Sequence, residues 1–261
     1  MVTLVQDLIR VRDDGARSLQ RKQSKDSYQY LSPMPLEACI HELFEKEVER
    51  NPGAAAILFA ETQLTYRELN NRANQLARFL RRFGVGPNSL VGLCVNRSPE
   101  MIVGILGILK AGAAYVPIDP DDSHERLSFV MDDANIFLLL TQSHLLDKLP
   151  RHNGPRLCLD SDWDIIAKER RANPARRAST RNLAYVIYTT ATTGFLKGVR
   201  ISHRGLVNYL SWGAEAYEVV KGCGSIVDSS VPFDLAITRV LAPLMVGRSV
   251  ILVTEDCYIN C

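Results

Sequence analysis

The fold class is decided by residues 89–119, SLVGLCVNRSPEMIVGILGILKAGAAYVPID, in which two apolar segments flank a helix-like segment. Residues 89–95 are nearly continuous in apolar side chains, which predicts a buried strand. Ser98, Pro99 and Glu100 open a helix, because a hydroxyl can cap the first turn and proline is tolerated there. Residues 113–118 predict the next strand. This order is typical of two parallel strands joined by a crossover helix.

The same alternation continues on both sides of this stretch. From Leu36, apolar residues recur at helical spacing up to Asn51. Thr65 and Glu68 have the spacing of a capping box, so a second helix is expected to begin there and to end near Gly84. Further strands are predicted at 54–59, 63–64, 136–141, 156–159, 183–188 and 225–229, and further helices at 123–134, 143–149 and 235–246. The predicted fold class is α/β, with layered, mostly parallel sheets flanked by helices.

Composition and charge exclude several classes of protein. The chain has 261 residues, of which 46% are hydrophobic and 23% charged, and its formal charge is +2. This composition is ordinary for a globular chain and excludes a disordered, fibrous or coiled-coil protein. Arginines crowd residues 170–181, but no aromatic side chains are interleaved with them. A solvated loop is therefore favoured there over nucleic-acid binding. The longest apolar run, Met101 to Leu109, is well short of the roughly 20 residues that cross a bilayer.

Cysteine usage and the N-terminus bear on the cellular compartment. The six cysteines are scattered without a C-x-x-C pair, so reduced thiols are expected. Asp7 and Arg10 interrupt the apolar residues near the N-terminus, so no signal peptide is visible and a cytoplasmic location is predicted. Residues 1–34 are polar and end in a proline-containing segment, which indicates a leader or linker with a domain boundary near Pro35.

A threonine-rich segment follows the predicted strand 183–188. Residues 189–198 read TTATTGFLKG and place four hydroxyls, two glycines and a lysine in one loop. Hydroxyls and backbone amides donate hydrogen bonds to phosphate oxygens, and a lysine adds a mobile positive charge. The spacing is not that of a Walker loop. On this segment alone, an ordinary threonine-rich strand end explains the residues equally well.

Three further motifs accompany this loop in a recognisable order: LTYREL at 64–69, LKAGAAYVPID at 109–119 and FDLA at 233–236. With them the chain resembles the N-terminal part of an adenylation domain of nonribosomal peptide synthetases, in the superfamily of AMP-forming ligases. The resemblance covers about residues 36 to 256. It implies an incomplete N-terminal subdomain of that fold over 35–256, with residues 257–261 as a tail unlike the family.

The resemblance implies a nucleotide site in the threonine-rich loop. Matching positions place the following residues around the β- and γ-phosphates of ATP, which is bound with Mg²⁺: Thr190, Thr192, Thr193, Gly194 and Lys197. Ala191 stands where the family usually has glycine, and Leu196 replaces the usual proline. If residue 191 needs a positive φ, alanine costs on the order of 1 kcal/mol there. Both departures are expected to weaken nucleotide binding.

Asp234 begins the predicted helix 235–246, and a carboxylate in that place can simply cap the helix. The resemblance implies a second role, in which Asp234 pairs with the α-ammonium group of an amino-acid substrate while Leu235 and Thr238 line its side-chain pocket. No metal ligands are assigned, because the histidines lack partners at ligand spacing. His203 is expected to cap a helix or lie at the surface.

The resemblance implies formation of aminoacyl-AMP and pyrophosphate from ATP and an amino acid, with transfer to a carrier-protein domain. The family's later motifs, which include the catalytic lysine, are not found, so no catalytic residue is assigned and the chain alone is expected to be inactive. Two alternatives remain: a non-catalytic docking fragment that contacts other synthetase domains, and a fragment similar to acyl-CoA ligases. Helix 235–246 is expected to be left partly uncovered in such a fragment.

Overall fold

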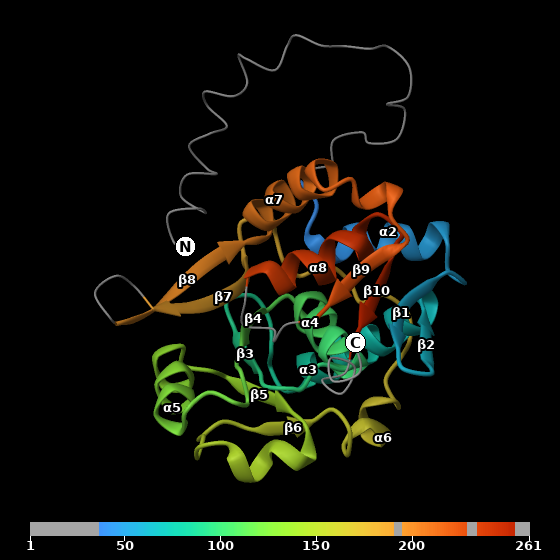
Figure 1. The fold of residues 1–261 in the computed structure, drawn as a ribbon. Helices are drawn as coiled ribbons and strands as arrows, with labels where there is room; N and C mark the ends of the chain where they lie inside the picture. Colours follow the sequence, from blue (N-terminus) through green and yellow to red (C-terminus); the bar gives the residue numbers. More distant parts are fainter. Residues whose placement is uncertain (1–36, 191–194, 229–233, 254–261) are drawn as a thin grey trace.

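Two sheets with helices packed between and around them make up the structure, a computed structural model that describes residues 37–190, 195–228 and 234–253 (Figure 1). The first sheet has six strands in the order β6-β5-β3-β4-β7-β8, and the second has four in the order β2-β1-β10-β9. The predicted α/β class is confirmed. Residues 1–34 and 257–261, predicted as leader and tail, lie outside the described residues.

The six-stranded sheet is parallel except at one edge. Its strands are β3 (Leu90–Leu93), β4 (Ala114–Pro117), β5 (Leu138–Thr141), β6 (Arg156–Cys158), β7 (Leu183–Thr190) and β8 (Leu196–Ser202). β8 pairs antiparallel with β7, whereas the other neighbours are parallel. β8 is therefore one of the two edge strands of this sheet, the other being β6, and in Figure 1 the β7–β8 hairpin extends away from the body of the protein.

The four-stranded sheet joins the beginning of the described chain to its end. Its strands are β1 (Ala55–Phe59), β2 (Thr62–Thr65), β9 (Gly224–Val227) and β10 (Ser249–Leu252). β1 pairs antiparallel with β2 and parallel with β10, so Ile57 lies opposite Val250. Parallel pairing of β10 with β9 completes the sheet. Sequence reading predicted β1, β2 and β9 but not β10.

The described residues form seven helices and two 3₁₀ turns. The helices are α2 (Ile40–Arg50), α3 (Tyr66–Arg82), α4 (Pro99–Ala111), α5 (His124–Asp133), α6 (Trp163–Ile166), α7 (His203–Ala216) and α8 (Asp234–Met245), with 3₁₀ turns η1 (Ser143–Lys148) and η2 (Val219–Lys221). Three of these helices, α3, α4 and α8, fill the space between the sheets. α4 contacts β3 and β4, α3 contacts β1, and α8 contacts β9 and β10. Figure 1 shows α3 and α4 in the middle of this arrangement.

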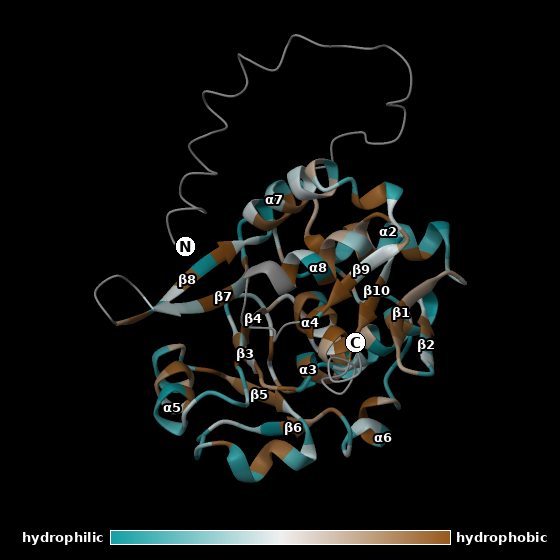
Figure 2. Ribbon diagram, in the orientation of Figure 1, coloured by the Kyte–Doolittle hydropathy of each residue, from teal (hydrophilic) through white to brown (hydrophobic). Residues whose placement is uncertain are grey.

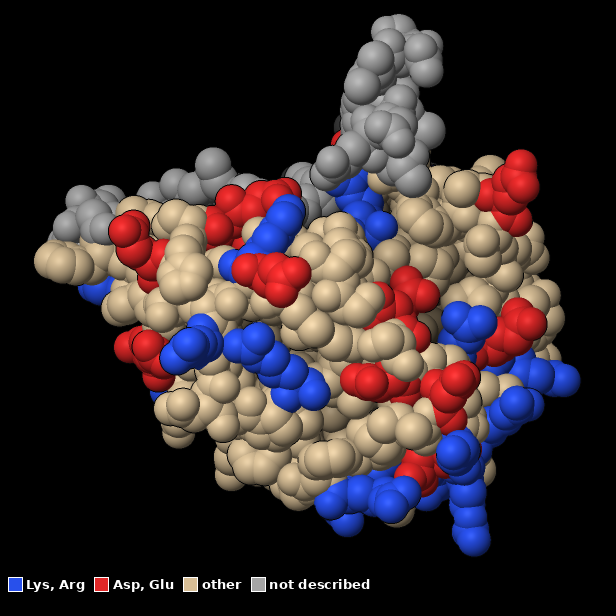
Figure 3. All heavy atoms as spheres, turned by 90° about the horizontal axis from the view of Figure 1, so that it is seen from below, with Lys and Arg blue, Asp and Glu red and all other residues tan. Residues whose placement is uncertain are grey.

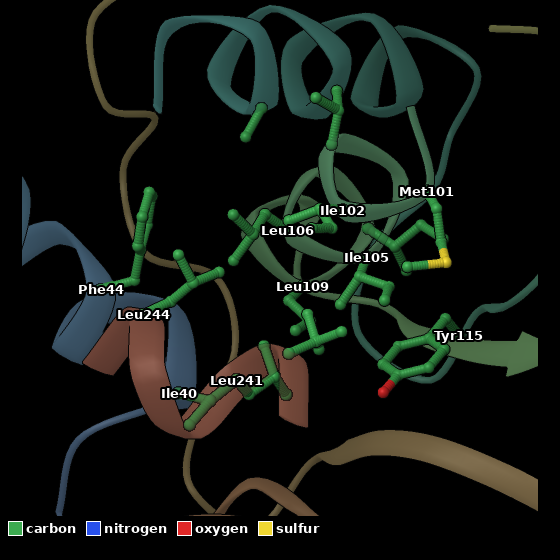
Figure 4. Close-up of a cluster of buried hydrophobic side chains, with 14 of the residues drawn as sticks. Ile40, Phe44, Met101, Ile102, Ile105, Leu106, Leu109, Tyr115, Leu241 and Leu244 are labelled. Carbon is green, nitrogen blue, oxygen red and sulfur yellow. The ribbon is translucent and has the colours of Figure 1, made fainter. Parts of the chain in front are cut away.

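The main hydrophobic core is built where α2, α4 and α8 meet. Figure 4 shows Phe44 and Leu244 beside the row of apolar side chains on α4. α4 is buried over almost its whole length, and Figure 2 shows it as largely hydrophobic. α8 is also covered: Leu241 and Leu244 are at most 2% exposed. The expectation that helix 235–246 stays partly uncovered is therefore wrong, because α2, α7 and the four-stranded sheet pack against it.

Local signals in the sequence explain where several helices begin and end. The capping box before α3 is confirmed, with the backbone N–H of Glu68 donating to Thr65 Oγ1. Gly84 ends the same segment with φ +88°, a left-handed conformation that favours glycine. Ser98 precedes α4 as predicted, but its hydroxyl makes no cap hydrogen bond and instead accepts one from Gln142. The predicted helix 143–149 is the 3₁₀ turn η1.

Tyr66, the first residue of α3, connects this helix to the distant end of the chain. Its ring is fully buried, and its hydroxyl lies 2.8 Å from the carbonyl oxygen of Arg248 and 3.2 Å from that of Leu244. Burial raises the pKa of the Tyr66 hydroxyl, so it remains a donor. The start of α3 and the connection from α8 to β10 are thus held together by the tyrosine of the LTYREL motif at 64–69.

An ion pair with a buried lysine joins α4 and α2. Lys110 on α4 has a fully buried side chain that forms an ion pair with Glu45 on α2. Burial lowers the pKa of Lys110 to about 8, although the charge of Glu45 opposes this shift. None of the helices in the described ranges combines the length and apolar character that a bilayer crossing requires.

Candidate functional site

The predicted nucleotide loop lies at the end of the β7–β8 hairpin. Thr190 is the last residue of β7 and Lys197 the second residue of β8, and both side chains are exposed. Thr192, Thr193 and Gly194 lie outside the described residues, as does Ala191. The structure therefore places the two ends of the predicted loop beside each other, on paired strands.

The register of the hairpin sorts these side chains between its two faces. Thr189 lies opposite Lys197, and Thr190 lies opposite Leu196. Directly opposed residues of an antiparallel pair point to the same face, and neighbours along a strand point to opposite faces. Thr189 therefore shares the face of Lys197, whereas Thr190 shares the face of Leu196. Leu196 packs against the apolar cluster around α5, which identifies that face.

Thr189 is the residue that sequence reading omitted from the site. Thr190 was predicted from its match to a family motif, and such a match does not indicate which side chains share a face of the hairpin. The strand β8 was not predicted beyond the loop, so the register that pairs Thr189 with Lys197 was not available. The short alternation of Val199 and Ile201 with Arg200 and Ser202 is a weak signal for a strand after the loop, from which the register could have been sought.

The two predicted site segments follow strands of different sheets. The nucleotide loop leaves the carboxyl end of β7, and the segment leading to Asp234 leaves the carboxyl end of β9. Ligands of open parallel sheets bind outside the carboxyl ends of the strands. Arg97, which follows β3, donates from Nη1 to the carbonyl oxygen of Val253, which follows β10, at 2.7 Å. The carboxyl edges of the two sheets therefore meet at this contact.

The predicted amino-acid pocket is described only at one residue. Asp234 and Leu235 start α8, but their side chains are not among those described. Thr238, one turn later, is 6% exposed, and its Oγ1 lies 3.2 Å from the hydroxyl of Tyr209 on α7. α7 also contacts β8, so this helix lies between the hairpin and α8. Arg239 forms an ion pair with Asp228 at the end of β9.

His203 differs from its prediction. It was expected to cap a helix or to be exposed, but it is the first residue of α7, is fully buried, and accepts a long hydrogen bond from the backbone N–H of Ile40. Ser202 provides the cap instead. Burial, with a smaller effect of Arg176, lowers the pKa of His203 to about 4. It is therefore neutral at pH 7 and packs α7 against α2.

Other candidate sites on the surface are weaker. One surface hollow has a volume of about 310 Å³ and is lined by residues none of which was predicted as a site residue: Glu68, Asn71, Arg72, Gln75, Trp163, Ala167 and Arg171. Within the ranges that the structure describes, no three histidine, cysteine or acidic side chains are grouped so that they could hold a metal ion. Residues 170–177 are mostly exposed, as predicted for a loop, although Asn173 accepts hydrogen bonds from Asn70 and Asn74.

Charged side chains of both signs are distributed over the surface. Figure 3 shows acidic and basic groups side by side over most of one face, with lysine and arginine side chains gathered at one edge of it. Arg82 in α3 pairs with Glu169 at 2.7 Å, and Arg126 in α5 pairs with Asp122 at 2.8 Å. Eight of the described lysine and arginine side chains form an ion pair with a carboxylate.

Known proteins resemble this chain in sequence over most of its length. Residues 44–259 match the family described as AMP-binding enzyme. Tyrocidine synthase 3 from Brevibacillus parabrevis is 45% identical over 222 residues, which are 84% of this chain and 3% of that protein. Gramicidin S synthase 2 from Brevibacillus brevis is 42% identical over 227 residues, which are 85% of this chain and 5% of that protein. The chain therefore spans less than a tenth of the length of these two relatives.

Solved structures agree with the sequence comparison. A crystal structure of the nonribosomal peptide synthetase FmoA3 with AMPPNP bound matches with a TM-score of 0.77 at 30% identity, over 86% of this chain and 23% of that chain. The N-terminal subdomain of Klebsiella oxytoca NpsA matches with a TM-score of 0.74 at 20% identity, over 86% of this chain and 58% of that one, which shows a shared fold. The chain belongs to the AMP-binding enzyme family and matches the adenylation domains of nonribosomal peptide synthetases.

Proposed function

We propose that this chain forms part of an amino-acid adenylation domain of a nonribosomal peptide synthetase. In the parent reaction a carboxylate oxygen of the amino acid bonds to the α-phosphorus of MgATP. The bond from that phosphorus to the bridging oxygen breaks, which releases pyrophosphate and leaves aminoacyl-AMP. The observation that carries the proposal is the β7–β8 hairpin, which holds Thr189 and Lys197 on one face at the carboxyl end of a parallel strand.

The hairpin is proposed to bind the β- and γ-phosphates of ATP. Lys197 supplies a positive charge on a flexible stem, and threonine hydroxyls supply neutral donors. The proposed ligands are Thr190, Thr192, Thr193, Gly194 and Lys197, to which the register adds Thr189. Mg²⁺ enters on the triphosphate as part of the substrate. FmoA3 with AMPPNP bound supports this proposal, since that relative holds an ATP analogue.

The start of α8 is proposed to recognise the amino acid. Asp234 would pair with the α-ammonium group, a charge-assisted contact that distinguishes amino acids from plain carboxylic acids. Leu235 and Thr238 would line the side-chain pocket, with the Thr238 hydroxyl oriented by Tyr209. FmoA3 has also been solved with α-methyl-L-serine-AMP bound, which supports an amino acid as substrate. This assignment favours amino-acid activation over the acyl-CoA ligase alternative.

The activity of the chain by itself is a separate part of the proposal. Stabilising the transition state of adenylate formation needs charge on several sides of the phosphates at once. The described residues bring Lys197 to one side of such a site. We expect the isolated chain to bind MgATP weakly and not to form aminoacyl-AMP. We further propose a cytoplasmic location and, as partners, a carrier-protein domain or other synthetase domains.

Titration of the purified chain with MgATP, followed by calorimetry, tests the nucleotide site. Lys197→Met is expected to weaken binding about tenfold or more, because a charge-assisted contact is lost. Lys168→Met removes an equally exposed lysine outside the hairpin and is expected to leave the affinity unchanged. Equal affinities of both variants for MgATP would falsify the assignment of Lys197.

Exchange of labelled pyrophosphate into ATP, measured with a panel of amino acids, tests the expected lack of turnover. Exchange clearly above background would show that the chain is active alone. If the chain binds no MgATP but co-purifies with other synthetase domains after mutation of Lys197 and Asp234, the docking-fragment alternative replaces this proposal.

A further inference from the structure

Tyr188 attaches the β7–β8 hairpin to α5 immediately before the pair formed by Thr189 and Lys197. Its hydroxyl donates to Asp133 Oδ2 at 2.5 Å, and its backbone carbonyl accepts from Arg126 Nη2 at 3.5 Å. The Phe129 ring meets the Tyr188 ring edge to face, with centroids 6.4 Å apart. Three side chains of α5 therefore hold one residue of the hairpin. We call Asp133, Arg126 and Phe129 the α5 clamp.

Glycine at position 198 leaves room for this arrangement. Gly198 lies opposite Tyr188 in the hairpin register, so the tyrosine ring crosses the hairpin over it. A Cβ atom at position 198 would lie 3.1 Å from Tyr188 Cζ and 3.1 Å from Val186 Cγ1, tighter than ordinary contact distances. A larger side chain would have to displace the ring. The glycine that follows Lys197 thus makes room for Tyr188, a role that the sequence alone did not indicate.

The α5 clamp holds the hairpin at the point where its residues change from buried to exposed. Tyr188 is buried, whereas Thr190, Phe195 and Lys197 farther along the hairpin are exposed. Among the described residues, the contacts of Tyr188 with Asp133 and Arg126 are the last side-chain hydrogen bonds from the body of the protein to the hairpin before Thr189 and Lys197. The direction in which those two side chains leave the sheet is therefore set at Tyr188.

The alternative is that Tyr188 is an ordinary structural tyrosine without a role in orienting the hairpin. A buried hydroxyl needs a partner wherever it lies, and Asp133 could do no more than provide one. However, Asp133 is exposed, so water can hydrate it without the tyrosine. Loss of the bond is then expected to cost little global stability while it releases the hairpin. The two roles can therefore be separated by experiment.

We propose that Tyr188, held by the α5 clamp over Gly198, is a positioning residue that fixes Thr189 and Lys197 for binding of the ATP phosphates. This inference rests on the proposed nucleotide site. It does not assign Tyr188 any contact with the nucleotide: Tyr188 lies on the face opposite Lys197 and acts through the backbone of β7 and β8.

Hydrogen exchange and nucleotide titration of Tyr188→Phe and Asp133→Asn test the proposal. Both variants are expected to speed amide exchange in β8 about tenfold, as for loss of a hydrogen bond to a charged group, with other elements unchanged. Both are also expected to weaken binding of MgATP about tenfold but that of AMP less than twofold, because AMP lacks the β- and γ-phosphates. Gly198→Ala is expected to act in the same direction by displacing the Tyr188 ring.

Matched controls use the same substitutions at exposed positions: Tyr217→Phe beyond α7 and Asp147→Asn in η1. Neither is expected to change exchange in β8 or binding of MgATP. Unchanged exchange in β8 of Tyr188→Phe overturns the clamp. Faster exchange with unchanged affinity for MgATP overturns the positioning role while the nucleotide site stands. Absence of MgATP binding by the unmodified chain overturns the proposed function, and the positioning role with it.

Discussion

The imidazole rings of His41 and His203 meet edge to face with their centroids 5.6 Å apart, in the contact between α2 and α7. Both rings are buried, and neither His41 Nδ1 nor His203 Nε2 has a hydrogen-bond partner among the described residues. Burial lowers the pKa of His41 well below 6.5, and each ring also faces nearby positive charge. Two neutral histidines therefore form a contact that protonation would disrupt.

The stability of the protein is expected to fall as the pH is lowered below about 6.5. The unfolded chain binds a proton at each histidine near that pH, whereas folded His203 does so only near pH 4. Stability contributed by the pair is fully present above pH 6.5 and is lost towards pH 4, by about 1.4 kcal/mol for each unit of pKa difference. Urea midpoints between pH 7.5 and 5 measure it.

Substitution of single histidines serves as the control for this pH dependence. His203→Gln is expected to flatten it, whereas His124→Gln, at an exposed position, is expected to leave the slope unchanged. An identical slope in all three proteins would show that the pair does not control the acid response.

Removal of the carboxylate that pairs with Lys110 is expected to destabilise the core. Glu45→Gln leaves a fully buried ammonium group without its partner, which costs about 3 kcal/mol of unfolding free energy. Glu49→Gln, an exposed position on the same helix, is expected to cost less than about 0.5 kcal/mol. Urea denaturation compares them. The double variant Glu45→Leu with Lys110→Met should recover most of the loss, since it removes both charges.

The contact between α3 and α4 depends on a glycine. A Cβ atom at Gly107 would lie 2.6 Å from Leu76 Cδ2 and 2.8 Å from Leu76 Cγ, so Gly107→Ala forces the two helices apart. We expect a loss of about 2 kcal/mol by thermal or urea unfolding, as for other overpacked cores. Gly53→Ala meets no atom within 4 Å and is the matched control. A stability of Gly107→Ala equal to that of the unmodified chain would contradict the packing.

The two faces of the hairpin predict unequal effects of two identical substitutions. Thr189→Val removes a hydroxyl on the face of Lys197, whereas Thr190→Val removes one on the face of Leu196. If the phosphates bind on the lysine face, Thr189→Val weakens binding of MgATP about fivefold to tenfold, the usual value of one hydrogen bond. Thr190→Val should then have the smaller effect. The reverse order, measured by calorimetry, would place the phosphates on the other face.

Much of this architecture could be predicted, because strong local signals and the global fold agree. The capping box at Thr65 and the alternation of apolar segments across 89–119 identified α3, β3, α4 and β4. The strands β8 and β10 were missed. β8 is an edge strand with polar and exposed residues, so it lacks the apolar pattern that identified the buried strands.

The candidate site could be predicted less completely than the fold. A family motif pointed to Lys197, but only the strand register pairs it with Thr189. The roles of Tyr188 and Gly198 depend on α5, which lies more than 50 residues earlier in the chain. Likewise, burial of His203 follows from its contact with α2, 163 residues away. Such long-range contacts leave no periodic pattern in a single sequence.

The Tyr66 hydroxyl has a consequence for biosynthesis. Leu244 and Arg248, whose carbonyl oxygens accept from this hydroxyl, are synthesised some 180 residues after Tyr66. The strand β10, which pairs with β1, is likewise synthesised late. Until then α3 can form as a helix and β1 can pair with β2, but the Tyr66 hydroxyl and the other edge of β1 lack their partners. The nascent polypeptide therefore cannot complete its first layer early, and a chain that stops before residue 248 should be recognised by chaperones or proteases as unfinished.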